Sequence, residues 1–343
     1  MADDDAPSDS LRGRADESRW KLWFLLDADR RLVSGAFVAV VFAGFLVAAY
    51  GLPGVVPFMR SSDPVETLFQ AFTTATITGV TLVLTLNQLV LSQELGAVGD
   101  QRERMSGAMA FREDVAGVID APVSPARPAQ FLRALVQVTG QRAEAFRAAV
   151  HGSVDESVAS DVDELTDSIT DNAEEVAGEL DGATFGEFDV ISAALDFNYS
   201  WKLFAARRIR ERHGDDLSGD ARDALEGVIE TLELFGPARE HFKTLYFQWE
   251  LIGLSRAVLT AAIPALVVSG SMVGFFDPSA ITVIVGGVNL LPLVIVLTAT
   301  VATVPFLVLL AYVLRIATVT KRTLSIGPFI LRDTDDVDEV EWE

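Results

Sequence analysis

The polar side chains best placed to interact with an ion or a ligand lie in one apolar stretch of the chain, between residues 67 and 93. Six uncharged polar side chains recur there at intervals of three and four residues, which places them on one face of an α-helix over about five turns. This polar stripe consists of Thr74, Thr78, Thr81, Thr85, Gln88 and Ser92. Hydroxyl and amide groups within hydrocarbon need water or a neighbouring helix. The stripe therefore either lines a water-filled pore, replacing part of an ion's hydration shell, or forms interhelical hydrogen bonds that hold a bundle together.

Charged residues follow the polar stripe at one end. Glu94 is the first charged residue after Glu66, and Arg102 and Arg104 follow within ten residues. In an oligomer, Glu94 would form a ring of carboxylates that attracts cations at the mouth of a pore. Alternatively, Glu94 anchors the helix at the membrane interface by pairing with Arg102 or Arg104.

Residue patterns that are typical of enzymes are absent from the sequence. The chain has no Cys and three His, which excludes disulfides, thiolate metal sites and cysteine nucleophiles and leaves no His pair at ligand spacing. It also has no Gly-Lys pair for a P-loop, no HExxH and no GxSxG. We expect no enzymatic activity, no cofactor and no metal site.

Four apolar segments must position the polar stripe. Residues 33–52 contain no charge, and 20 residues at 1.5 Å each give a helix of about 30 Å, the thickness of a hydrocarbon core. Further spans are predicted at 67–93, 257–276 and 291–314, with 281–290 as a partly buried outer or re-entrant segment. Gly270 and Gly274 form a GxxxG pattern in the third span, which favours close helix packing.

The distribution of Lys and Arg predicts the orientation of these spans. Fifteen basic residues lie close to the span ends on one side, whereas Arg60 alone lies on the other. By the positive-inside rule both termini and the segment 96–250 are cytoplasmic. Residues 1–32 then form a cytoplasmic segment with interfacial aromatics that does not resemble a cleavable signal peptide, 33–95 and 251–314 hold two spans each, and 315–343 form an acidic tail.

The segment 96–250 is predicted to be a helical domain, because its apolar residues recur every three or four positions. One helix follows Pro128, and a second covers 154–180, with a Ser153–Glu156 capping box at its start. A third runs from 188 to about 214 and a fourth covers 225–235. A fifth begins at Pro237 as a first-turn residue and continues into the third span. The fold class is thus all-α, with four transmembrane helices and a helical cytoplasmic domain between spans two and three.

The acidic charge balance indicates a salty environment and is not evidence of a basic binding partner. The chain carries 49 acidic against 27 basic residues, a net charge of −22, although 50% of it is apolar and its mean hydropathy is +0.32. Asp is abundant and only four residues are Lys, a composition similar to that of proteins from salt-in halophiles. In molar salt the Debye length falls to about 3 Å, so self-repulsion costs little. The acidic surface excludes nucleic acid as a partner.

The run Asn87-Gln-Leu-Val-Leu-Ser-Gln-Glu-Leu-Gly96 resembles a group of uncharacterised multi-pass membrane proteins from halophilic archaea. That resemblance implies membrane location and a halophilic source, and it implies no activity. The predicted layout is also similar to that of bestrophin-type anion channels, as an analogy of architecture without a matching pore motif.

Three functions remain as hypotheses. The first is a passive, homo-oligomeric channel in the cell membrane, lined by the second span and conducting inorganic ions. The second is a membrane-anchored scaffold or sensor whose helical domain binds a cytoplasmic protein. The third is a secondary transporter, which the lack of an ionisable residue in any span core disfavours.

Overall fold

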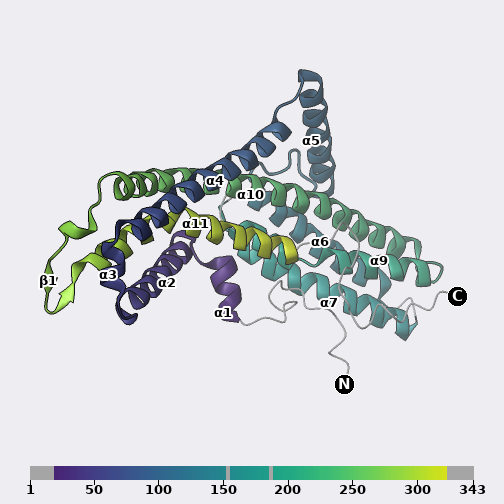
Figure 1. Cartoon of the computed structure of the whole chain (residues 1–343). Coiled ribbons are helices and arrows are strands. Elements are labelled where there is room, and N and C mark those ends of the chain that lie inside the picture. The colour runs from purple at the N-terminus through teal and green to yellow at the C-terminus, as the bar shows by residue number, and fades with distance from the viewer. Residues whose placement is uncertain (1–18, 152–154, 185–187, 323–343) are drawn as a thin grey trace. The chain divides into compact units, whose positions relative to one another are not determined.

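The protein is helical along almost all of the chain that the computed structural model describes, which is residues 19–151, 155–184 and 188–322 (Figure 1). It divides into two compact units. The apolar unit comprises residues 23–96 and 247–319, and of the described chain the acidic unit comprises residues 19–22, 97–246 and 320–322.

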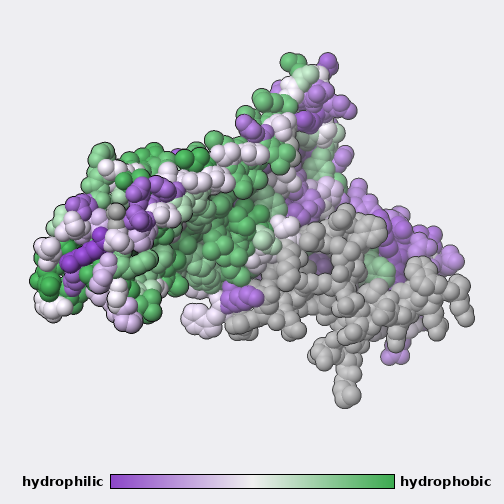
Figure 2. Space-filling model, in the orientation of Figure 1, coloured by the Kyte–Doolittle hydropathy of each residue, from purple (hydrophilic) through white to green (hydrophobic). Residues whose placement is uncertain are grey.

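Four helices carry the apolar unit: α2 (Arg30–Gly51), α4 (Ser62–Glu94), the second half of α10 (Gly219–Gly274) and α11 (Leu290–Arg322). Each is long and apolar enough to cross a membrane, in agreement with the four predicted spans. Apolar side chains cover much of the visible face of this unit (Figure 2). A short helix α1 (Arg19–Leu22) and a π-helical turn (Trp23–Asp27) precede α2, whose N-cap Asp29 accepts a hydrogen bond from the Arg31 amide at 2.7 Å.

The connection between α10 and α11 is a small hairpin. After a 3₁₀ turn at Pro278–Ala280, β1 (Ile284–Val285) pairs antiparallel with β2 (Val288–Asn289). Gly286 and Gly287 form the turn with φ values of 56° and 82°, a conformation that side chains with a Cβ rarely adopt. In the single chain residues 282–288 are exposed and residues 281, 289 and 290 are half-buried, so only the ends of the predicted segment 281–290 are partly buried. The other connection, between α2 and α4, holds the short helix α3 (Val55–Arg60).

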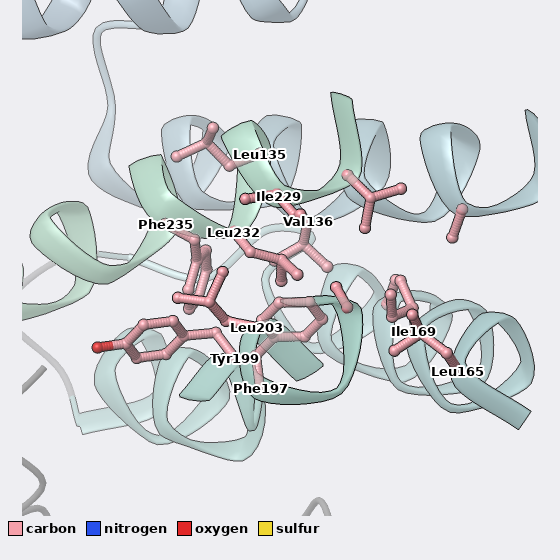
Figure 3. Packing of buried hydrophobic residues seen from close by; sticks show 14 of the residues in the cluster. Leu135, Val136, Leu165, Ile169, Phe197, Tyr199, Leu203, Ile229, Leu232 and Phe235 are labelled. Carbon is pink, nitrogen blue, oxygen red and sulfur yellow. The ribbon is translucent and has the colours of Figure 1, made fainter. Parts of the chain in front are cut away.

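The acidic unit packs its own apolar core. Its helices are α5 (Val98–Val118), α6 (Pro128–Val150), α7 (Glu156–Glu179), α8 (Phe188–Asp196), α9 (Tyr199–His213) and the first half of α10. Leu135 of α6, Ile169 of α7 and Leu232 of α10 lie in this core with no exposed surface, and Figure 3 shows them with their neighbours. The periodic apolar residues of the predicted helical domain therefore do form its interior.

Two predicted helix boundaries in this unit are wrong. The third predicted helix is two helices, because the chain breaks at residues 197–198 and Asn198 becomes the N-cap of α9. The fourth and fifth are one helix, so Pro237 lies inside α10 and not in a first turn. Packing explains why the helix continues through a proline: Phe235 and Ala238 on either side are buried in the core.

Two further helix starts differ from the sequence prediction. α5 was not predicted, because its apolar residues lack a clear three-to-four spacing. α7 begins after Asp155 as N-cap, while Ser153 of the predicted capping box lies outside the described residues. The predicted end of α7 is confirmed, since Gly182 adopts a φ of 77° just beyond the helix.

Candidate functional site

The polar stripe lies on the side of α4 that faces away from the other helices of the apolar unit. The buried positions Val65, Phe69, Thr76 and Val83 fall within about 40° of one another at 100° per residue. On the same scale the six stripe residues fall about 140° to 220° from Val65, which is the opposite side of the helix. α4 therefore packs with one face and presents the polar stripe on the other.

All six residues of the polar stripe are exposed in the single chain. Apolar side chains border them on both flanks, and these are exposed as well: Leu82 (53%), Leu84 (45%), Leu89 (60%) and Leu91 (55%). The outward side of α4 is thus a narrow polar band between two leucine-rich edges. Leucine suits lipid or the apolar surface of another helix, whereas the polar band offers hydroxyl and amide groups suited to water or to a polar partner.

The hydroxyl groups of the polar stripe donate their hydrogen bonds within α4. Thr74 donates to the Gln70 carbonyl at 3.1 Å, and Thr81 to the Ile77 carbonyl at 2.9 Å. Thr78, Thr85 and Ser92 do the same at 2.9, 3.0 and 2.7 Å, to the carbonyls of Thr74, Thr81 and Leu89. Among the described residues these hydroxyls make no hydrogen bond to α2, α10 or α11. Any interhelical bonds made by the polar stripe would have to form between copies of the chain.

The outward polar band is longer than the sequence analysis recognised. The polar stripe continues toward the start of α4 through Gln70, Thr67 and Asp63, at spacings of four, three and four residues from Thr74. All three residues are exposed. The Gln70 amide donates to the Glu66 carboxylate at 2.9 Å. The same three-to-four spacing is present in the sequence, where Thr67 and Gln70 belong to the predicted span 67–93 and Asp63 lies just before it.

A different polar residue of α4 does connect two helices. Asn87 lies on the packed side, and its Oδ1 is 2.8 Å from the hydroxyl of Ser255 on α10, which is buried. Gly79 lies on that side too, where a Cβ would be 3.6 Å from the Phe306 ring of α11. The packed side of α4 thus carries its own interhelical hydrogen bond and close contact, without any residue of the polar stripe.

A buried charged cluster joins three helices of the apolar unit, and the sequence analysis did not identify it. Glu250 of α10 accepts from Arg30 of α2 at 3.1 Å and lies 3.7 Å from Arg315 of α11, with side-chain exposures of 7 to 12%. Arg315 also donates to the carbonyls of Leu26 and Ala28, and Arg30 donates to the Ala28 carbonyl at 3.3 Å. Arg30 lies 220 positions before Glu250, and most of two membrane-length helices separate Glu250 from Arg315, so only the fold brings these residues together.

The remaining predicted residues are placed as follows. Glu94 is the last residue of α4 but its side chain lies outside the described part, and Arg102 and Arg104 are exposed on α5. Gly270 and Gly274 are exposed near the end of α10, and a Cβ at either would meet no atom within 4 Å. A packing role for these glycines would require a second copy of the chain and stays a prediction.

No metal-binding cluster is evident in the described part of the chain, where no three His, Asp or Glu residues are grouped to hold an ion. A cavity of about 290 Å³ lies between α2, α3, α4 and α11, and Phe45, Leu52, Phe58, Met59 and Ile295 are among the apolar residues that line it. Such a lining can take an acyl chain and offers nothing to orient a polar substrate. The polar stripe is therefore the most specific surface of the apolar unit.

The fold and the stripe define an all-α protein with four helices able to cross a membrane, one of which carries an outward polar face. The chain belongs to a family of unknown function, DUF7972, whose model matches residues 1–343. No curated protein and no solved structure matches it. The family agrees with the expected likeness to uncharacterised proteins, while a halophilic archaeal source stays a prediction.

Proposed function

We propose that the protein is a passive ion channel of the cell membrane, assembled from several copies with α4 around a central water-filled axis. The observation that carries this proposal is the position of the polar stripe, opposite the side by which α4 packs in its own chain and bordered by leucines. A face of this kind meets water only if copies of α4 surround a common axis.

Gln88 argues most strongly against lipid as the neighbour of the stripe. A threonine that donates to its own helix can tolerate lipid, since its donor hydrogen is satisfied. The exposed side-chain amide of Gln88 has two donor hydrogens and an acceptor oxygen, and an amide without partners in an apolar medium costs roughly 2–7 kcal/mol. An aqueous axis removes that cost.

The Lys and Arg distribution supports the orientation within this proposal. The connections 52–61 and 275–289 carry Arg60 as their single basic residue, whereas the other ends of the four helices are rich in Lys and Arg. The acidic unit and both ends of the chain then lie in the cytoplasm. Asp63 lies at the outer end of the pore and Ser92 near the inner end.

Ion flux through liposomes tests the proposal. Purified protein in vesicles loaded with salt should release ions down their gradient faster than empty vesicles, and Gln88→Ala should change that rate because it removes a polar group from the axis. Leu309→Ala serves as the matched control, since Leu309 packs within the chain against Val83 and Leu254. The proposal fails if the intact protein, Thr81→Ala and Gln88→Ala all behave as empty vesicles do.

A scaffold or sensor remains the second candidate, and the separate core of the acidic unit favours it. That core is complete without any residue of the apolar unit. This candidate predicts that a fragment of residues 100–245 binds one specific cytoplasmic protein with the same affinity as the full chain. It also predicts that the substitutions in α4 leave that binding unchanged.

A further inference from the structure

We infer that the pore formed by α4 conducts small monovalent cations and rejects anions; this inference rests on the proposed channel. It follows from the direction of the hydrogen bonds along the polar stripe and from the charge at its outer end. Neither property depends on how many copies surround the axis.

The hydroxyl groups of the polar stripe offer oxygen lone pairs to the axis. The hydroxyls of Thr74, Thr78, Thr81, Thr85 and Ser92 each donate to a carbonyl of α4 at 2.7 to 3.1 Å. Their hydrogens are therefore directed into the helix, and their remaining capacity is to accept. A cation is stabilised by such oxygens directly, as it is by the carbonyl oxygens of a selectivity filter.

An anion would need the hydrogens that the helix already uses. To solvate it, each hydroxyl would have to give up its bond to the backbone, at a cost of about 1 kcal/mol for each bond that is broken. This cost recurs at five positions along α4, whereas a cation incurs none of it. Among the stripe residues of the described helix only Gln88 has amide donors that could replace the lost ones, and none is Lys or Arg.

The outer end of the polar band carries a carboxylate in the same register. Asp63 precedes Thr67 by four residues, is exposed, and falls about 160° from Val65, within the angular range of the stripe. On this side of the four helices Arg60 is opposed by Asp63, Glu66 and Asp277. In an oligomer Asp63 repeats around the axis, and such a ring concentrates cations at the entrance.

The same features favour monovalent over divalent cations. Tight binding of Ca²⁺ uses six to eight oxygens with several carboxylates among them. Between Asp63 and Ser92 the polar band holds only neutral hydroxyl and amide groups. Neutral oxygens compensate for the lost water of a monovalent ion more readily than for that of a divalent ion.

A role of Asp63 in stabilising the start of α4 must be distinguished from its role in attracting cations. Acidic residues are common in the first turn of a helix, where they interact favourably with the helix dipole. Asp277 offers a matched control, because it lies on the same side of the four helices, is exposed, and caps a turn by accepting from the Ser279 amide at 2.8 Å. Asp277→Asn removes the same charge, and asparagine can still cap the turn.

Reversal potentials under a KCl gradient test the inference with full-length protein in planar bilayers. We expect the intact protein to reverse close to the K⁺ equilibrium potential, and Asp63→Asn to lower the K⁺/Cl⁻ permeability ratio about tenfold by loss of local cation concentration. Asp63→Glu should keep the ratio and Asp277→Asn should leave it within about twofold, because screening weakens distant charges.

The outcomes distinguish this inference from the proposed function. If no variant conducts above an empty bilayer, the channel itself is disproved and the inference falls with it. Conduction with a preference for Cl⁻ would overturn the inference while the channel stands. A cation preference that Asp63→Asn leaves unchanged would overturn the role assigned to the carboxylate.

Discussion

The two units of this protein place polar and apolar groups in opposite ways. In the acidic unit apolar side chains such as Leu135 and Ile169 are buried, and ion pairs such as Arg207 with Glu233 lie on the surface with 45 and 48% exposure. In the apolar unit leucines are exposed on α4, and an ion cluster centred on Glu250 is buried. The surface of the acidic unit suits water, and the exposed apolar helices of the other unit suit hydrocarbon.

A few residues in each unit depart from this pattern of burial and exposure. In the acidic unit Lys202 and Arg239 are buried, but each has a local explanation, since Lys202 lies 5.5 Å from the centre of the Phe197 ring and Arg239 lies 4.5 Å from that of Tyr199. In the apolar unit the exception is the polar stripe. Nothing in the described part of the chain covers it, and the proposed channel rests on this exposure.

The largest loss of stability is expected from a substitution of the buried Glu250. Glu250→Gln leaves the buried guanidinium groups of Arg30 and Arg315 without the carboxylate between them. Removing one partner of a buried ion pair costs about 3–5 kcal/mol, so the free energy of unfolding should fall by that order. Thermal unfolding of the protein in detergent measures the loss.

An exposed ion pair of the acidic unit provides the control for Glu250. Glu226 lies 3.4 Å from Arg210, with side-chain exposures of 52 and 35%. Exposed pairs contribute about 0–1 kcal/mol, so Glu226→Gln should shift the unfolding temperature little. If the two variants lose equal stability, the contrast between a buried polar interior and a solvated polar surface is wrong.

A somewhat smaller effect is expected from truncating leucines in the two units. Leu232 has no exposed surface in the core of the acidic unit, so Leu232→Ala should cost about 2–5 kcal/mol of unfolding free energy. Leu89 is 60% exposed on α4, and Leu89→Ala should change the stability of a single copy by less than about 0.5 kcal/mol. Unfolding in a detergent that keeps single copies compares them, and a larger loss at Leu89 would contradict the assigned exposure.

Sequence periodicity predicted most of the helices, but not α5 and not every boundary. The spans and most helices of the acidic unit followed from apolar residues at helical spacing and from uncharged length. The break before α9 and the passage of α10 through Pro237 depend on tertiary packing around Phe235, which no local pattern records. The hairpin at Gly286 and Gly287 was not predicted, although a Gly-Gly pair directly after the β-branched run 281–285 is a sequence signal for a two-residue hairpin turn.

The same limit applies to the candidate site. Spacing alone predicted that the polar stripe occupies one face, because its residues belong to one helix. Whether that face was packed or outward could not be known until the other helices were placed. The cluster of Arg30, Glu250 and Arg315 could not be predicted at all, since its members come from three helices and each alone resembles an ordinary charge at the end of a span.

Thiol accessibility along α4 distinguishes a water-filled axis from a helix face that meets lipid or another helix. The chain contains no Cys, so single cysteines can be introduced without any background reaction. In lipid vesicles a charged, membrane-impermeant methanethiosulfonate should modify Thr78→Cys, Thr81→Cys and Thr85→Cys on the order of tenfold faster than Leu82→Cys and Leu84→Cys, because thiolates form in water and not in hydrocarbon. Equally slow modification of both sets would contradict a water-filled axis along the polar stripe.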